Sequence, residues 1–345
     1  MRTAGNDADL PLAPMANWLA GHVEGFASPF TIHRFSGGQS NPTYRITASS
    51  GDYVLRRKPF GSLLPSAHAI EREFRLIEAL YPAGFPVPKP LSLCGDPEVI
   101  GSSFYVMNYI EGRNFFDGAL PDLKAEERSK IYHGLIDTLA ALHQVDPHGV
   151  GLSDFGKPGN FFSRQVNRWT QQYRASETDH ISEVEKLIEW LPKTVPAQSR
   201  ITIVHGDYRI DNLIFDSDLT VAAVLDWELA TLGDPLMDVA YLALNWLLPA
   251  DGGAALGGAD LAASGIPDLD SIVARYMLAT KSQFNAPFEW YLAFSLFRVI
   301  GILQGVKRRI LDGNAAGAEA PRHAAKIRPF AEIAWSLATQ AKAKL

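Results

Sequence analysis

Residues 205–212, which read His-Gly-Asp-Tyr-Arg-Ile-Asp-Asn, constrain the fold more than any other stretch of this chain. Short apolar runs flank them: Ile-Thr-Ile-Val precedes, and Leu-Ile-Phe and Val-Ala-Ala-Val-Leu follow, with a polar turn at Ser217 and Asp218 between the last two. Runs rich in β-branched residues and bounded by turn residues predict strands. The two later runs therefore predict a hairpin that places Asn212 where one strand starts and Asp226 where the other ends.

The polar residues of this stretch provide the groups that phosphoryl transfer requires: a base for the acceptor hydroxyl and oxygen ligands for magnesium. Asp207 is predicted to be the base, and Asn212 and Asp226 are predicted to hold Mg²⁺. His205 completes the spacing H-x-D-x-x-x-x-N of a kinase catalytic loop and is expected to pack and hydrogen-bond the loop. Glu228 is expected either to reach a second metal ion or to cap the segment that follows.

Each of these residues also has a structural interpretation when it is taken alone. His205 suits a core position, Asp207 a turn, and Asn212 the start of a strand. Their joint occurrence in a strand context, with Asp226 at the end of the hairpin, favours catalysis over three separate structural roles. The sequence thus indicates an ATP- and Mg²⁺-dependent kinase, and a non-catalytic nucleotide-binding protein on the same fold is the alternative.

The composition is that of a globular protein with enough residues for two lobes. The 345 residues are 47% hydrophobic and 20% charged, with a formal net charge of -6. An acidic balance gives no electrostatic reason to bind nucleic acid or an anionic membrane. The longest apolar run, residues 291–306, is interrupted by Arg298 and predicts a buried helix rather than a membrane span. The expected partner is therefore a small molecule with a hydroxyl group, and no feature of the sequence predicts the oligomeric state.

Cysteine usage bears on the location of the protein. The chain has one cysteine, Cys94, and its first 14 residues include acidic side chains but no apolar leader. A single thiol cannot form an internal disulfide, which is typical of reducing compartments. We therefore expect a cytoplasmic location.

Strand patterns dominate the N-terminal third, over residues 31–35, 43–46, 53–56 and 104–110. A turn rich in small residues joins the first two strands. Such a turn either directs backbone N–H groups at a phosphate or is an ordinary hairpin connection. The residues predicted to bind the nucleotide here are Gly37, Gly38, Gln39, Ser40 and Asn41.

The third strand is predicted to direct a cation at the α- and β-phosphates. Side chains alternate along a strand, and this register selects Arg56 over its two basic neighbours. Residues 65–80 predict an amphipathic helix that contains Glu73. Glu73 is expected either to pair with Arg56 or to be a solvated carboxylate.

A change of pattern after residue 112 marks a lobe boundary, because strands give way to helices. The predicted α+β architecture has an N-terminal extension (residues 1–30), a small β-rich lobe (31–110) and a larger helical lobe (111–345). A hinge at the end of the last strand is predicted to read the adenine edge with its backbone. The hinge residues are Met107, Asn108 and Tyr109.

Two features of the C-terminal part have alternative interpretations. Residues 251–265 are rich in Gly and Ala and predict either a flexible surface loop or a flap at the acceptor site. A basic concentration predicts either a solvated face or an anion site. Its members are Lys307, Arg308, Arg309, Arg322, Lys326 and Arg328.

Six segments carry a resemblance to a known family: residues 37–44, 53–56, 71–75, 205–212, 225–228 and 233–240. Together they resemble the aminoglycoside phosphotransferase and choline kinase family, which implies the bilobal protein-kinase-like fold. Gly206 stands where regulatory protein kinases have an arginine, and Arg56 stands where most kinases have a lysine. Control by a phosphorylated activation loop is therefore not expected.

Within that family, residues 37–80 are most similar to the kinase domains found fused to, or encoded beside, acyl-CoA dehydrogenases. This resemblance implies a hydroxyacyl-CoA or a related acceptor, whose phosphates the C-terminal basic residues would suit. An aminoglycoside or a choline-like molecule is the alternative acceptor. A polycationic antibiotic would require a dense acidic wall, and the sequence offers none that we could locate.

Overall fold

The computed structural model describes residues 3–4, 10–35, 41–60, 69–313 and 320–345. The chain divides into two compact units. The first comprises Met1–Phe116, Val145–Leu152 and Arg209–Ala230, and the second comprises Asp117–Gln144, Ser153–Tyr208 and Thr231–Leu345. The chain passes from the second unit to the first between Tyr208 and Arg209, inside the motif that the sequence singled out.

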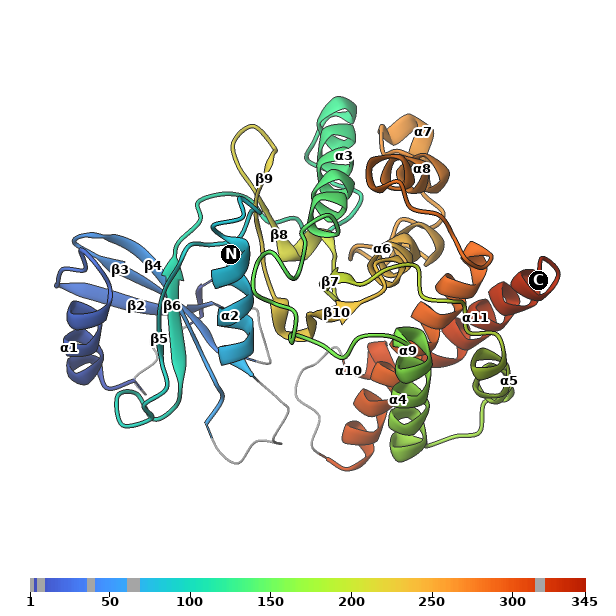
Figure 1. The fold of residues 1–345 in the computed structure, drawn as a ribbon, viewed down its shortest axis with the longest axis horizontal. Helices are drawn as coiled ribbons and strands as arrows, with labels where there is room; N and C mark the ends of the chain where they lie inside the picture. Colours follow the sequence, from blue (N-terminus) through green and yellow to red (C-terminus); the bar gives the residue numbers. More distant parts are fainter. Residues whose placement is uncertain (1–2, 5–9, 36–40, 61–68, 314–319) are drawn as a thin grey trace. The chain divides into compact units, whose positions relative to one another are not determined.

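The first unit is built on a six-stranded antiparallel sheet with the order β1-β2-β3-β4-β6-β5 (Figure 1). All four strands predicted in this part of the chain are present. The sheet also contains two further strands, β1 and β5, which the patterns did not predict. The bounds are β1 (Thr3–Ala4), β2 (Phe30–Phe35), β3 (Thr43–Ala48), β4 (Gly51–Arg57), β5 (Pro90–Cys94) and β6 (Phe104–Asn108).

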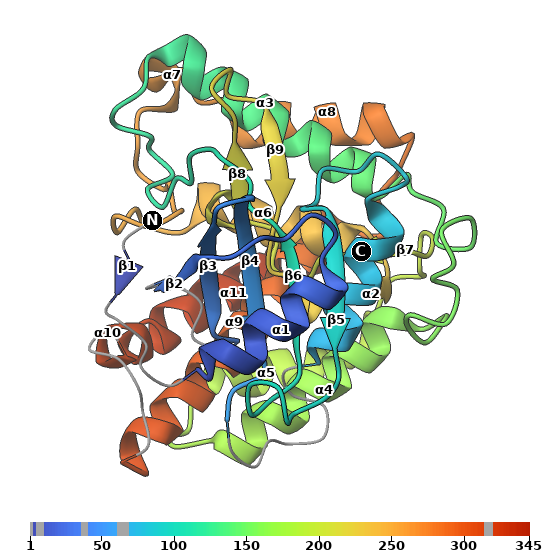
Figure 2. The ribbon, with the colours of Figure 1, turned by 90° about the vertical axis from the view of Figure 1, so that its left-hand side faces the viewer.

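Two helices cover opposite faces of this sheet. Helix α1 (Leu12–His22) buries Met15 and Leu19 in a core cluster with Leu55 of β4. The next residue, Arg56, pairs with Glu73 of helix α2 (Ile70–Leu80). Neighbouring side chains of a strand point to opposite faces, so α1 and α2 lie on different sides. Figure 2 views the sheet from the side of α1.

The first unit also contains the predicted hairpin, formed by β8 (Leu213–Phe215) and β9 (Val221–Val224). Leu213 lies opposite Val224 in the register, and the N–H of Leu225 donates to the backbone carbonyl oxygen of Asn212 at 2.8 Å. At the turn, Oδ1 of Asp216 accepts the N–H groups of Asp218 and Thr220 at 2.9 and 2.8 Å. The hairpin therefore confirms the positions predicted for Asn212 and Asp226 relative to its strands.

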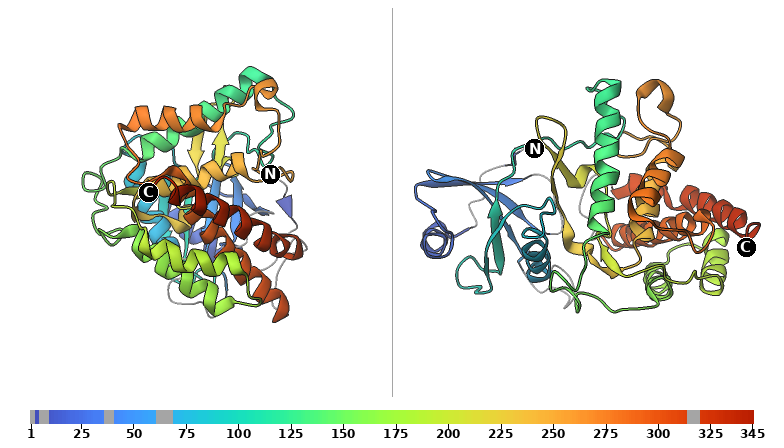
Figure 3. Two further views of the ribbon diagram at one scale, coloured as in Figure 1. Left: turned by 90° about the vertical axis from the view of Figure 1, so that its right-hand side faces the viewer. Right: turned by 45° about the horizontal axis from the view of Figure 1, so that its top comes forward.

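The second unit is helical, apart from the short pair β7 (Thr202–Val204) and β10 (Thr231–Gly233). Its longest helix, α9 (Phe288–Leu311), packs against α4 (Phe161–Ser176), α6 (Leu236–Leu247) and α11 (Ile327–Lys342), and Figure 3 shows α11 beside α9. Phe162 of α4 makes edge-to-face contacts with three aromatic rings of α9. The remaining helices are α3 (Ala125–Leu142), α5 (Ser182–Trp190), α7 (Leu261–Ser264), α8 (Leu269–Thr280) and α10 (Ala320–Ala325).

A small sheet lobe and a larger helical lobe are present, as predicted. The compact units do not have the predicted bounds, because the β8–β9 hairpin and residues 145–152 belong to the first unit. Within the described chain, no helix combines the length and the apolar character that crossing a membrane requires. The helix predicted over residues 291–306 is the middle of α9, and its interior residues are buried among other helices.

Candidate active site

Arg56 is the centre of a buried ion-pair cluster in the first unit. Its Nε donates to Oε2 of Glu73 at 2.9 Å, and its Nη2 donates to Oδ1 of Asp226 at 2.7 Å. Oε2 of Glu228 lies 4.0 Å from the same Nη2. The predicted pair between Arg56 and Glu73 is thus confirmed. The fork of a guanidinium serves two carboxylates at once, which the single ammonium group of a lysine does less well.

Burial controls the electrostatics of this cluster. Burial acts most strongly on Arg56 and lowers its pKa, but the charges of Glu73 and Asp226 outweigh it, so the pKa is raised. Tyr105 lies opposite Arg56 in the β4–β6 register and hydrogen-bonds Glu73. Burial raises the pKa of Tyr105 well above its usual value. Arg56 is therefore a permanent positive charge between two carboxylates.

Asn212 and Asp226 flank the open end of the β8–β9 hairpin. Asn212 ends a short 3₁₀ turn, Ile210–Asn212, and Asp226 follows β9 with a left-handed backbone (φ 63°, ψ 60°). Non-glycine residues rarely adopt this conformation, and they concentrate at functional sites. An amide oxygen and a carboxylate are hard oxygen ligands of the kind that Mg²⁺ prefers. The donor set on this hairpin therefore fits a magnesium ion.

Asp207 belongs to the second unit, where its loop follows β7. Asp238, in the first turn of α6, accepts the N–H of His205 with Oδ2 at 2.7 Å and the N–H of Gly206 with Oδ1 at 2.8 Å. His205 is fully buried, and its Nδ1 accepts the N–H of Asp207 at 3.2 Å. His205 thus packs and hydrogen-bonds the loop, as predicted.

A buried chain of hydrogen bonds supports Asp238. Nε2 of His143 lies 3.2 Å from Oδ2 of Asp238, and Nδ1 of His143 lies 2.7 Å from the Tyr276 hydroxyl. Burial lowers the pKa of His143, so we assign a neutral ring that donates from Nε2 and accepts at Nδ1. Burial alone would raise the pKa of Asp238, but its hydrogen bonds outweigh it and lower that pKa. Asp238 therefore binds the N–H groups of the loop as an ionised carboxylate and not as a protonated acid.

Two residues that contact the Asp207 loop were not identified from the sequence. The hydroxyl of Tyr241 in α6 donates to Oδ1 of Asp207 at 2.8 Å. Nη2 of Arg298 in α9 donates to the Gly206 oxygen at 2.5 Å. Two signals were available: Tyr241 follows Asp238 by three positions, which puts both on one helix face, and Arg298 is the lone charge in an apolar run.

The predicted nucleotide-binding turn and hinge are described only in part. Gly37, Gly38, Gln39 and Ser40 lie outside the described residues, whereas Asn41 is buried just before β3. The hinge residues Met107, Asn108 and Tyr109 are at and just after the end of β6.

The backbone donors of the hinge already have partners within the first unit. The N–H of Asn108 donates to the backbone carbonyl oxygen of Lys89 at 3.0 Å, and the N–H of Tyr109 donates to that of Asp52 at 3.3 Å. An adenine that hydrogen-bonds to this hinge would therefore use its other backbone groups.

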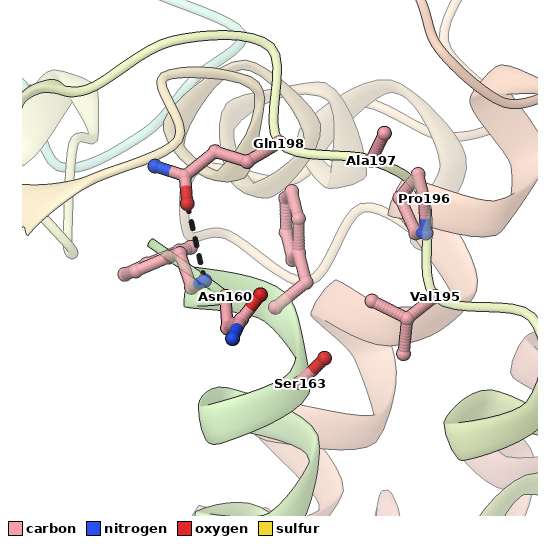
Figure 4. Close-up of a pocket in the computed structure, with 8 residues that line it drawn as sticks. Asn160, Ser163, Val195, Pro196, Ala197 and Gln198 are labelled. Carbon is pink, nitrogen blue, oxygen red and sulfur yellow. Dashed lines mark hydrogen bonds between the residues drawn. The ribbon is translucent and has the colours of Figure 1, made fainter. Parts of the chain in front are cut away.

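A pocket of about 340 Å³ opens at the first turn of α4 (Figure 4). Asn160 and Ser163 face residues 195–198, and Oε1 of Gln198 accepts the N–H of Phe161 at 3.3 Å. The eight residues that line it include none of the predicted site residues. The pocket therefore does not coincide with the predicted chemistry.

The C-terminal basic residues are largely paired with carboxylates of the second unit. Lys326 contacts the Asp251 carboxylate, Arg322 lies 3.9 Å from the same carboxylate, and Lys307 contacts Asp179. Arg308 lies 3.8 Å from Asp312. These pairs favour the solvated-face interpretation over an anion site. Asp251 also connects the start of the Gly- and Ala-rich loop to α10 and its neighbour Lys326.

Comparison with known proteins assigns the chain to a family. Residues 31–273 match the model of the family described as the phosphotransferase enzyme family. Mouse acyl-CoA dehydrogenase family member 10 is 46% identical over 315 residues, which cover 90% of this chain and 30% of that protein. Human acyl-CoA dehydrogenase family member 11 is 39% identical over 327 residues, which cover 93% of this chain and 42% of that protein. The chain thus spans less than half the length of these relatives.

Solved structures agree with this assignment. A crystal structure from Ralstonia eutropha JMP134, provisionally named an aminoglycoside phosphotransferase, has a TM-score of 0.89 and 42% identity, and the match covers 96% of this chain and 99% of that one. The aminoglycoside phosphotransferase APH(4)-Ia, in a complex with ADP and hygromycin B, has a TM-score of 0.60 and 16% identity, over 90% of this chain and 94% of that one. The second match shows the fold alone, which is the predicted protein-kinase-like fold. The chain belongs to the phosphotransferase enzyme family.

Proposed function

We propose that this chain is a kinase that moves the γ-phosphoryl group of ATP to the hydroxyl of a small molecule, with a hydroxyacyl-CoA as the acceptor. The observation that supports this most is the contact of Arg56 with both Glu73 and Asp226. It joins the residue expected at the phosphates to a residue expected at the metal. A family of phosphotransferases and a relative crystallised with ADP support the nucleotide.

Asp207 accepts the proton of the acceptor hydroxyl as its oxygen attacks the γ-phosphorus. The bond from that phosphorus to the β–γ bridging oxygen breaks in line, and ADP leaves with the electron pair. Arg56, held by Glu73, contacts the α- and β-phosphates. Asn212 and Asp226 would hold Mg²⁺, which would supply positive charge to neutralise the phosphates.

The acceptor is proposed from the relatives. Two relatives that match over about nine-tenths of this chain bear the name of acyl-CoA dehydrogenase family members. A hydroxyacyl-CoA has both the hydroxyl group that a kinase requires and the acyl-CoA moiety that this name implies. The paired C-terminal basic residues supply no separate support for CoA binding.

The proposal is tested by ADP release from Mg-ATP with a panel of hydroxyacyl-CoAs, aminoglycosides, choline and sugars. We expect turnover with at least one hydroxyacyl-CoA and none with Asp207→Asn. Turnover on an aminoglycoside and on no other acceptor would support the kinase activity but contradict a hydroxyacyl-CoA as the acceptor. Absence of turnover on every acceptor, together with calorimetric ATP binding that does not depend on Mg²⁺, would favour a non-catalytic nucleotide-binding protein.

A further inference from the structure

One face of helix α6 holds three consecutive residues of the Asp207 loop. Asp238 binds the backbone N–H groups of His205 and Gly206 at 2.7 and 2.8 Å. Tyr241, one turn later, binds the side chain of Asp207 at 2.8 Å. Residues three apart lie on the same face of a helix. Helix α6 therefore positions both the backbone of the loop, through Asp238, and the side chain of Asp207, through Tyr241.

Arg298 of α9 contacts the loop and Tyr241. Its Nη2 donates to the Gly206 oxygen at 2.5 Å, and its Cζ lies 4.9 Å from the centre of the Tyr241 ring. The ring of Trp169 lies 5.5 Å from the same Cζ. A cation over an aromatic face is attracted by the ring and draws electron density from it. The Tyr241 hydroxyl thereby becomes a stronger donor toward Asp207.

The burial of Arg298 has no evident explanation in stability. The residue is 3% exposed, and its Nε and Nη1 have no acceptor among the described residues. The ion pairs of the described chain give it no carboxylate partner either. A buried charge without a counter-ion costs free energy. Its contacts are with Gly206, Tyr241 and Trp169, so its position is explained by the loop and not by an ion pair.

We propose that Tyr241, polarised by Arg298, is the positioning residue that orients the carboxylate of Asp207 toward the acceptor hydroxyl. This rests on the proposed function of Asp207 as the base. Tyr241 fixes Oδ1 and thereby the plane of the carboxylate. A base acts only within hydrogen-bond reach of the proton, so a carboxylate that rotates loses rate without losing nucleotide binding.

The test uses Tyr241→Phe, which removes one hydroxyl and keeps the ring under Arg298. We expect kcat to fall by roughly tenfold and the KM for ATP to stay within about twofold. We also expect the KM for the acceptor to change less than kcat, because the hydroxyl of Tyr241 orients the Asp207 carboxylate and does not itself bind the acceptor. Arg298→Met should shift kcat in the same direction.

Tyr132→Phe is the matched control, because Tyr132 is buried and donates to the Gly118 oxygen at 2.6 Å, away from the Asp207 loop. It should lose comparable stability and keep the wild-type kcat. A wild-type kcat in Tyr241→Phe would overturn the proposal.

A second measurement separates this proposal from the proposed function. If the wild type turns over no acceptor, the proposed function fails, and carboxyl ¹³C NMR of Asp207, assigned with Asp207→Asn, decides the positioning. A carboxyl chemical shift of Asp207 that differs between Tyr241→Phe and the wild type at one fixed pH supports it, because the contact with the Tyr241 hydroxyl is lost. An unchanged chemical shift overturns it.

Discussion

Nη2 of Arg56 lies 2.7 Å from Oδ1 of Asp226, although 170 positions separate the two residues in the sequence. The same guanidinium contacts Glu73, so one cation links the sheet, helix α2 and the end of the β8–β9 hairpin. Arg56, proposed for the phosphates, and Asp226, proposed for the metal, are therefore in contact within the first unit. Substitution of either residue removes a hydrogen bond from the other.

Removal of the Glu73 charge should destabilise the first unit. Glu73→Gln leaves the buried Arg56 with one carboxylate fewer, and breaking such a buried pair costs about 3 kcal/mol of unfolding free energy. Glu71→Gln is the control, because its pair with Lys58 is partly exposed to solvent and contributes below about 1 kcal/mol. Urea unfolding measures both. Equal losses in the two variants would contradict the assigned importance of the Arg56 cluster.

Arg56→Lys should weaken nucleotide binding while keeping the charge. A lysine cannot contact Glu73 and Asp226 with a two-pronged fork, so the cation is less well placed for the phosphates. The loss of one charge-assisted hydrogen bond lowers the affinity for Mg-ATP by about tenfold. Isothermal titration calorimetry measures it, and an unchanged affinity would exclude Arg56 from the phosphate site.

Asp226→Asn should raise the magnesium requirement. A neutral amide is a weaker ligand, so the Mg²⁺ concentration for half-maximal rate should rise by at least about tenfold. Asp216→Asn, at the opposite end of the same hairpin, should leave that concentration unchanged. Chelation of the metal with EDTA should abolish turnover in the wild type. Turnover that survives chelation would remove the metal from the mechanism.

Asp207→Asn should abolish chemistry and spare binding. Loss of a general base costs roughly a hundredfold or more in kcat. Asp137→Asn, which breaks an exposed pair with Arg275, serves as the control for removal of a carboxylate. Rates from ADP release and affinities from calorimetry separate the two effects. A kcat within tenfold of the wild type would show that another group takes the proton.

Gly206→Ala should cost stability and rate together. Gly206 has a φ of 84°, a conformation that costs an L-residue about 1–2 kcal/mol, and both of its backbone polar groups are engaged. Gly21→Ala, in open space on α1, should instead leave stability unchanged or raise it. Thermal unfolding and kcat of both variants provide the check.

Acid should destabilise the second unit in two steps. The pKa of His143 is lowered from 6.5, so below about pH 6.5 the unfolded chain takes up a proton that the folded chain refuses, and stability falls. The pKa of Asp238 is lowered from 3.8, so its contribution is present above pH 3.8 and is lost as the pH falls through the folded value.

The first step depends on the His143 ring, so His143→Gln should remove it. The second step should change as well, because the hydrogen bond from His143 helps to lower the pKa of Asp238. Urea unfolding between pH 8 and pH 2 resolves the two. A variant that retains the slope near pH 6.5 would assign that step to another histidine.

Much of the local structure follows from the sequence. The period-two pattern over residues 53–56 placed Arg56 and Leu55 on opposite faces, and the structure has Leu55 in the α1 core and Arg56 against α2. The hairpin around Ser217 was predictable because β-branched runs and a polar turn define it locally. The pattern missed β5, because residues 90–94 start at a proline after a proline-rich connection.

The partners of these side chains were decided by the tertiary structure alone. Periodicity reports which side of an element is buried, but it does not report which other element covers that side. Nothing in the sequence connects Arg56 with Asp226, or Arg298 with Gly206, because such contacts depend on packing between elements far apart in the chain. The sequence therefore determined the kinds of groups available for chemistry, and folding decided which carboxylate holds the loop, which tyrosine meets Asp207 and which cation is buried beside them.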